Sequence, residues 1–218
     1  MASVLTFPVR GSPRVDSLLV GGGLHLLAVW VPLLPLIAVA GYLSRVLAAT
    51  ATAESHVDPD RPDWRPVGAL LFDGFRLTAT TVGYLAVPVA LLVVTLGGPL
   101  EGFDPTGTTD GLLFTIGSTV STLLAAAICY PLPAALAAVA REGTLRAAVD
   151  RSLVGAAAQD AGYLVATLLA AGGLGLAAAL YEPLNAVALG FFCAFYVEVV
   201  AAAAVGRATG RAWRRRGV

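Results

Sequence analysis

Two ionisable side chains, Glu198 and His25, lie inside long apolar stretches of the chain and are the residues best placed to do chemistry. Glu198 interrupts the apolar stretch 183–206, and His25 lies within the charge-free stretch 17–44. In a membrane, a carboxylate that faces lipid is costly and belongs in the interior of a helix bundle. We therefore expect Glu198 to meet His25, Arg76 or a tyrosine hydroxyl on a neighbouring helix.

The neighbours of Glu198 along the chain also favour an interior position. Helix positions four residues apart lie near one face, and small residues on such a face let helices approach closely in lipid. Glu198 belongs to a row of this kind, which is Ala186, Gly190, Ala194, Glu198, Ala202 and Gly206. Two roles follow for its carboxyl group: a structural hydrogen bond that holds the last helix, or a protonatable group on a transport path.

No other group of residues predicts a reaction. The sequence contains no phosphate-binding loop, nucleotide fingerprint, metal-ligand cluster or nucleophile elbow. Ser118 and Ser121 have no base nearby in the sequence, and Cys129 and Cys193 are typical of small apolar residues in a helix. His56 falls in an acidic loop, where water solvates it. We expect no enzymatic activity, no metal and no cofactor, and the zero net charge gives no field that attracts nucleic acid.

The chain is too apolar for a soluble domain of its length. Of its 218 residues, 57% are hydrophobic and 13% are charged, whereas soluble domains carry about 25% charged residues. The charges divide the chain into five apolar stretches, each able to hold one spanning helix of about 20 residues. We predict an all-α, polytopic helical bundle in the cell membrane. Its spans lie within 17–44, 77–100, 111–140, 161–181 and 183–206.

Prolines interrupt the first and the third of these stretches. Two prolines lie within 32–35 and two within 131–133, and proline removes a helical hydrogen bond and kinks the helix. Each break is either a tolerated kink in a tilted span or a broken helix that lines a cavity. The first stretch also admits a re-entrant path bent at 31–35, with arms too short to cross. A cleaved signal peptide is a third alternative, because 38–40 imitate a cleavage site.

The arginines predict the orientation. All 14 basic residues are arginines, and they concentrate in the segments 45–76, 141–160 and 207–218. Cytoplasmic loops of membrane proteins are enriched in basic residues. Five spans with the N-terminus outside place every arginine except Arg10 and Arg14 in the cytoplasm, with 207–218 as a basic tail. The re-entrant path would place all of them there.

Two of the arginine-bearing segments contain short helices that we expect along the inner leaflet. They are 66–76 and 143–157, and the second places Leu145, Val149 and Leu153 on one face. Amphipathic helices of this kind lie in the membrane interface. They either connect and anchor the spans or form a docking surface for a protein partner or a lipid headgroup.

The tripeptide Gly-Tyr-Leu occurs three times, at 41–43, 83–85 and 162–164. The second and third copies open a span just after an arginine-bearing segment, and each such segment follows a proline-broken span. This order predicts an internal repeat of 17–100 and 111–181. The whole chain, 1–218, forms a single domain that 183–206 completes as an extra span.

Several short motifs resemble the family called domain of unknown function 4013. The match is most specific over residues 41–75, and the resemblance implies an archaeal or bacterial integral membrane protein without a site to carry over. The missing lysine and the Asp-rich loops separately indicate a GC-rich, salt-loving source. The motifs that carry the resemblance are Leu18–Gly23, Gly41–Leu43, Arg45–Leu47, Asp63–Trp64, Leu71–Phe75, Phe195–Tyr196 and Gly206–Ala208.

Two functions agree with these observations. The first is a scaffold, assembly or membrane-organising protein whose cytoplasmic helices bind a partner. The second is a translocator of a small solute or ion, built on the two parallel repeats. The few polar groups inside the spans, Glu198 and His25 among them, exclude a strongly charged cargo. The sequence leaves the oligomeric state open.

Overall fold

The computed structural model describes residue 7 and residues 16–53, 62–97, 108–185 and 188–218, and this part of the chain is helical without a strand. His56, Arg10, Arg14 and the acidic segment 101–107 lie outside the described residues. Within the described residues, five helices are long and apolar enough to cross a membrane, which confirms the predicted all-α bundle. They are Leu33–Thr52, Val67–Leu96, Phe114–Glu142, Ala161–Asn185 and Leu189–Arg216.

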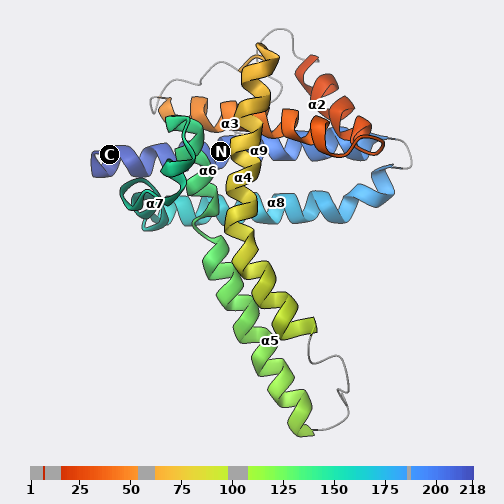
Figure 1. Ribbon diagram of the computed structural model, residues 1–218, viewed down its shortest axis with the longest axis vertical. Helices are drawn as coiled ribbons and strands as arrows, with labels where there is room; N and C mark the ends of the chain where they lie inside the picture. Colours follow the sequence, from red (N-terminus) through yellow and green to blue (C-terminus); the bar gives the residue numbers. More distant parts are fainter. Residues whose placement is uncertain (1–6, 8–15, 54–61, 98–107, 186–187) are drawn as a thin grey trace.

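The first apolar stretch forms two helices rather than one span. α2 covers Asp16–Leu27 and α3 covers Leu33–Thr52, and they meet at a sharp bend (Figure 1). Pro32, at the start of α3, has no N–H to donate to a preceding turn. The predicted single span 17–44 is therefore wrong in its bounds. α2 has 12 residues, about 18 Å, and is too short to cross a bilayer core of about 30 Å.

The bend lies where the re-entrant alternative placed it, but the arm that follows is longer than that alternative assumed. α3 has 20 residues, or about 30 Å, because the helix continues past Arg45 to Thr52. Arg45 does not end the helix because its guanidinium contacts the chain segment that precedes the next helix. α3 alone is therefore long enough to span.

α4 covers Val67–Leu92 and continues into a π-helical turn at Val93–Gly97. The predicted separate interfacial helix 66–76 is wrong, because these residues form the first turns of α4. Neither glycine nor proline separates Arg76 from the apolar run that follows, so the helix has no reason to stop there. The second Gly-Tyr-Leu copy consequently lies within α4 rather than at its start.

The third apolar stretch breaks at its prolines into α5 (Thr108–Cys129) and α6 (Leu132–Glu142). Beyond it, the predicted helix 143–157 is also divided. A 3-10 turn covers Leu145–Val149 and α7 covers Arg151–Ala158. Asp150 separates them because its carboxylate accepts the first free N–H groups of α7 and so starts a new helix.

α8 covers Ala161–Asn185 and α9 covers Leu189–Arg216. The predicted basic tail 207–218 is therefore not a tail, since almost all of it belongs to α9. Ala208, Ala212 and Trp213 are buried there. The arginines made this segment look like a polar tail in the sequence. In the structure they occupy the outer face of the last turns of α9, while small residues occupy the inner face.

α3 lies at the centre of the molecule and packs against α2, α4, α6 and α9. In Figure 1, α3, α9 and α8 run side by side across the long axis, and α4 crosses in front of them. α5 runs beside the lower part of α4 and rises through the proline break into α6. The three helices of the layer and the α4–α5 pair thus run in different directions.

Glycines make close helix contacts on both sides of α3. A Cβ on Gly74 of α4 would overlap the carbonyl oxygen of Ile37, and one on Gly41 of α3 would overlap that of Leu70. On the other side of α3, a Cβ on Gly210 of α9 would overlap the Ala51 carbonyl. Both contacts place backbone against backbone, as small residues permit in lipid.

Much of the apolar surface faces outward. Leu168 and Leu176 of α8 are more than 60% exposed, and Val94 beyond α4 is 73% exposed. Only 6% of the apolar window of α8 is buried within the protein. Soluble proteins do not expose continuous apolar helices of this length, whereas lipid covers them without cost.

Gly74→Ala should weaken the α3–α4 crossing, because the added methyl group has no room against the Ile37 carbonyl. We expect the free energy of unfolding to fall by about 1–3 kcal/mol, measured as a lower Tm in detergent. Gly83→Ala, on the same helix, is the control, since nothing lies within 4 Å of the added Cβ. Equal Tm values for the two variants would contradict the close approach.

Candidate functional site

Glu198 and His25 face each other across the contact between α9 and α2. The imidazole Nε2 of His25 lies 3.2 Å from Oε1 of Glu198, and its Nδ1 lies 3.0 Å from the carbonyl oxygen of Gly21. The two side chains are 11% and 28% exposed. His25 was one of the three partners predicted for Glu198, and the structure confirms it.

The other two predicted partners are engaged elsewhere. Arg76 lies 3.6 Å from Asp73 in an ion pair on α4, and its guanidinium stands over the ring of Phe72 at 4.1 Å. The hydroxyls of Tyr84 on α4 and Tyr163 on α8 bond to backbone groups at the opposite end of the layer, as described below. Of the two named residues, His25 contacts Glu198 and Arg76 pairs with Asp73.

Aromatic rings surround the pair. The ring of Phe195, one turn before Glu198 on α9, lies 6.0 Å from the imidazole of His25. Behind it, Tyr42 and Trp64 stack at 4.3 Å with an interplanar angle of 13°. Oε2 of Glu198 is buried and has no hydrogen-bond partner among the described residues. The site is thus a polar pair inside an aromatic cluster.

Arg45 holds the chain segment before α4 against α3, and this segment places Trp64 in the aromatic cluster. Its guanidinium donates to the carbonyl oxygens of Asp63 at 2.6 Å and Arg65 at 2.9 Å, and its Nε lies 3.5 Å from the carboxylate of Asp73. These contacts fix the chain before α4 against the side of α3. The motifs within 41–75 therefore share one task, which is to join α3 to α4.

The hydroxyl of Tyr163 on α8 bonds two backbone groups at the proline break between α5 and α6. Its hydroxyl donates to the carbonyl oxygen of Tyr130 at 2.9 Å and accepts the N–H of Ala134 at 3.0 Å. These two backbone groups would bond to each other in an unbroken helix, so the hydroxyl is inserted into the helical ladder. Sequence reasoning singled out the Gly-Tyr-Leu tripeptide as a repeat and missed this role.

Three further side chains tie the same end of the molecule together through backbone carbonyls. The Tyr84 hydroxyl donates to Ala148 at 2.6 Å and the Tyr130 hydroxyl donates to Ala158 at 2.9 Å. The indole N–H of Trp213 donates to Leu153 at 2.8 Å. Because α4, the proline break after α5, the 3-10 turn, α7 and α9 each contribute, this end is cross-linked by hydrogen bonds.

The three arginine-bearing segments converge on this end. The guanidinium of Arg141 stands 4.8 Å over the ring of Trp213, and Arg215 pairs with Asp160 at 2.8 Å. Arg214 donates to the carbonyl oxygen of Ala51 at the end of α3. The segments 141–160 and 207–218 therefore lie together beside the end of α3.

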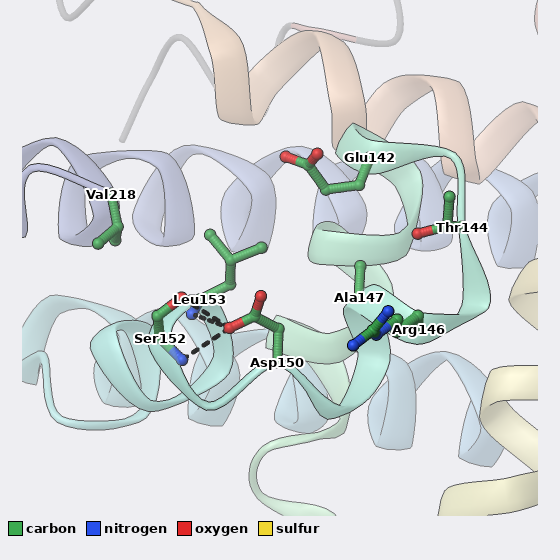
Figure 2. A pocket seen from close by; sticks show the side chains of 8 residues that line it. All are labelled: Glu142, Thr144, Arg146, Ala147, Asp150, Ser152, Leu153 and Val218. Atoms are coloured by element: carbon green, nitrogen blue, oxygen red, sulfur yellow. Dashed lines mark hydrogen bonds between the residues drawn. The ribbon is translucent and has the colours of Figure 1, made fainter.

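A pocket of about 410 Å³ opens at this end, between α6, the 3-10 turn and α7. Figure 2 shows Asp150 turned toward Ser152, with Arg146 on the other side of the pocket and Glu142 above. The pKa of Asp150 is lowered, first by the hydrogen bond from the Ser152 hydroxyl and then by backbone N–H groups. Asp150 is thus occupied as a helix cap. No group of three His, Cys, Asp or Glu within the described residues could hold a metal.

These features define a class of protein: an all-α bundle with five helices able to cross a membrane, cross-linked at its arginine-rich end. A family model described as "protein of unknown function (DUF4013)" matches residues 24–186, and the chain belongs to this family. The match includes His25 but ends before α9 and Glu198, so the resemblances at 18–23 and 195–208 lie outside it. No curated protein and no solved structure matches the chain.

Tyr163→Phe should leave the backbone groups of Tyr130 and Ala134 unpaired at the break. We expect the free energy of unfolding to fall by about 1–3 kcal/mol, the cost of a buried unsatisfied polar group, with a lower Tm in detergent. Tyr181→Phe on the same helix is the control, because its ring packs on Phe191 and no described residue bonds its hydroxyl. A Tm for Tyr163→Phe equal to that of the control would contradict the inserted hydroxyl.

Asp160, just before α8, should make stability depend on pH. Burial opposes its ionisation, but the N–H of Tyr163 and the guanidinium of Arg215 outweigh burial and lower its pKa. Because the pKa of Asp160 is lowered in the folded protein, its ionised carboxylate stabilises the fold at pH values above the ordinary pKa of about 3.9. This stabilisation is lost as the pH falls through the pKa of the folded protein. We expect Tm to drop below about pH 4, less steeply in Asp160→Asn and in Arg215→Gln. An unchanged slope in both variants would contradict the contacts.

Proposed function

We propose that this protein is a membrane-organising scaffold of the cell membrane, whose arginine-rich end docks a protein partner in the cytoplasm. The docking surface is defined as the exposed side of the 3-10 turn and α7, with the pocket beside it. The proposal assigns no catalytic residue, no cofactor and no nucleic acid to the chain.

The main observation behind the proposal is that two apolar side chains, Leu145 and Val149, are exposed on the 3-10 turn beside charged residues. Val149 is 72% exposed and Leu145 is 46% exposed, and Arg146 and Glu142 line the pocket beside this turn. Tyr84 holds this turn by its bond to the Ala148 carbonyl. Apolar side chains held rigidly in a charged rim are typical of surfaces that bind proteins.

Photo-crosslinking in native membranes tests this proposal. A photoreactive residue at Val149 should yield a discrete protein adduct, whereas one at Val165, which is 51% exposed on α8, should yield lipid adducts. Arg146→Glu should reduce the protein adduct, because the reversed charge repels a partner selected for this rim. Mass spectrometry identifies the adducts. Lipid adducts alone at Val149 would contradict a protein partner.

A second candidate function is the translocation of a small solute or ion, and the His25–Glu198 pair favours it. Carboxyl and imidazole groups that pair inside a membrane bundle are typical of the proton relays of pumps and transporters. In proteoliposomes, this function predicts dissipation of a pH gradient by the native chain and its loss in Glu198→Gln. No difference between native and empty vesicles would contradict it.

A further inference from the structure

The last turns of α9 carry a surplus of positive charge, near the point marked C in Figure 1. Residues 207–216 contain five arginines and no acidic residue. A guanidinium group stays ionised in proteins and offers five N–H donors in a planar fork that matches carboxylate and phosphate groups. The contacts of these arginines decide how much of their charge is left for a ligand.

α9 is packed on three sides in these turns. Gly210 lies against the Ala51 carbonyl at the end of α3. Trp213 bonds to α7, and α8 packs along α9 as well. Arg211 lies about 100° around the helix from Gly210 and about 160° from Trp213, and it is exposed. Its side chain therefore leaves α9 on the open side.

Arg214 and Arg215 flank Arg211 on the same face of α9. Arg215 is neutralised by Asp160, whose carboxylate lies 2.8 Å from its Nη1. Arg214 donates from Nη1 to the Ala51 carbonyl oxygen at 3.3 Å, and that oxygen carries no formal charge. No described residue bonds to the guanidinium group of Arg211. Arg211 and Arg214 therefore keep their positive charge at positions where Cβ atoms lie about 5–6 Å apart.

The bond to Ala51 prepares Arg214 to bind an anion. It uses only one N–H of the guanidinium group, so other N–H groups remain to donate. It also holds a long side chain in one orientation, which reduces the conformational entropy that binding would otherwise cost. Arg211, one turn before, can then donate to the same anion from the open side of α9.

The depth of Arg211 in the membrane selects the anion. The apolar run of α9 ends at Gly206, and Arg211 lies about 7–8 Å further along the helix axis. The polar headgroups form a layer of about 5–8 Å on each side of the hydrocarbon core. The first turns of the neighbouring α8 expose Leu164 and Val165, which suit an acyl chain. Arg211 therefore lies at the level of lipid phosphates, next to a helix that lipid covers.

We propose that Arg211 and Arg214 form a binding site for the phosphate group of an anionic phospholipid, in the leaflet that this end of the protein faces. In the predicted orientation this is the cytoplasmic leaflet, where anionic lipids give a negative surface potential. The site does not depend on the proposed protein docking, because neither arginine belongs to the 3-10 turn, to α7 or to the pocket beside them.

Native mass spectrometry of the detergent-solubilised chain tests the headgroup. Phosphatidylglycerol and phosphatidylcholine with identical acyl chains differ only in the headgroup, so the ratio of their Kd values isolates its contribution. Each arginine near a lipid surface contributes about a factor of five to binding of an anionic lipid. We therefore expect the first phosphatidylglycerol to bind about 30-fold more tightly than phosphatidylcholine. Equal Kd values for the two lipids would overturn the proposal.

Arg211→Gln tests the position of the site. It should weaken phosphatidylglycerol binding about fivefold and leave phosphatidylcholine binding and the Tm unchanged, because Arg211 holds no described residue. Arg216→Gln is the matched control, since it removes the same charge from an exposed position of α9, about 140° around the helix from Arg211. Equal losses in the two variants would show a response to net charge alone and would overturn the site.

Inorganic phosphate separates a lipid site from a site for a soluble anion. A phospholipid is also held by the burial of its acyl chains, which free phosphate cannot replace. We expect an excess of inorganic phosphate to leave the bound phosphatidylglycerol in place on the native chain. Displacement of the lipid by inorganic phosphate would assign the two arginines to a soluble ligand and would overturn the lipid site.

Discussion

The structure depends on how closely α3 is approached by the helices on either side of it. α4 and α9 each bring backbone against the backbone of α3, at Gly41 and Gly74 on one side and at Gly210 on the other. Lipid provides no hydrophobic drive for helices to associate, so close van der Waals contact must supply the attraction. The aromatic cluster and the arginine-rich end then form at the two ends of the layer that these contacts create.

The second requirement is that broken helices still satisfy their backbone. Proline opens the ladder between α5 and α6, and in lipid an unpaired carbonyl costs several kcal/mol. Tyr163 meets this requirement with a single hydroxyl that both donates and accepts. Other backbone carbonyls at this end of the molecule accept hydrogen bonds from Tyr84, Tyr130 and Trp213. Tyrosine is well suited to this role because its ring is apolar and its tip is polar.

The sequence predicted the class of the fold because charge and hydropathy are local properties. It also predicted the contact between Glu198 and His25, since few polar groups exist inside the apolar stretches. It failed where helix ends are set by contacts between distant segments. The helix at 66–76 merges with α4, and 207–216 is held in α9 because Trp213 bonds to Leu153. The periodicity of one segment does not show which distant residues will contact it.

The distance along the chain between His25 and Glu198 has a consequence for biosynthesis. The two residues are 173 positions apart, and a ribosome adds about 5–20 residues per second. His25 is therefore made on the order of 10–30 s before the carboxyl group that it meets. During that interval α2 cannot pack on α9. The side chain of His25 must then be solvated by water or shielded by the translocation machinery. α9 thus completes the packing of α2, and this contact reaches its native form only after Glu198 has been made.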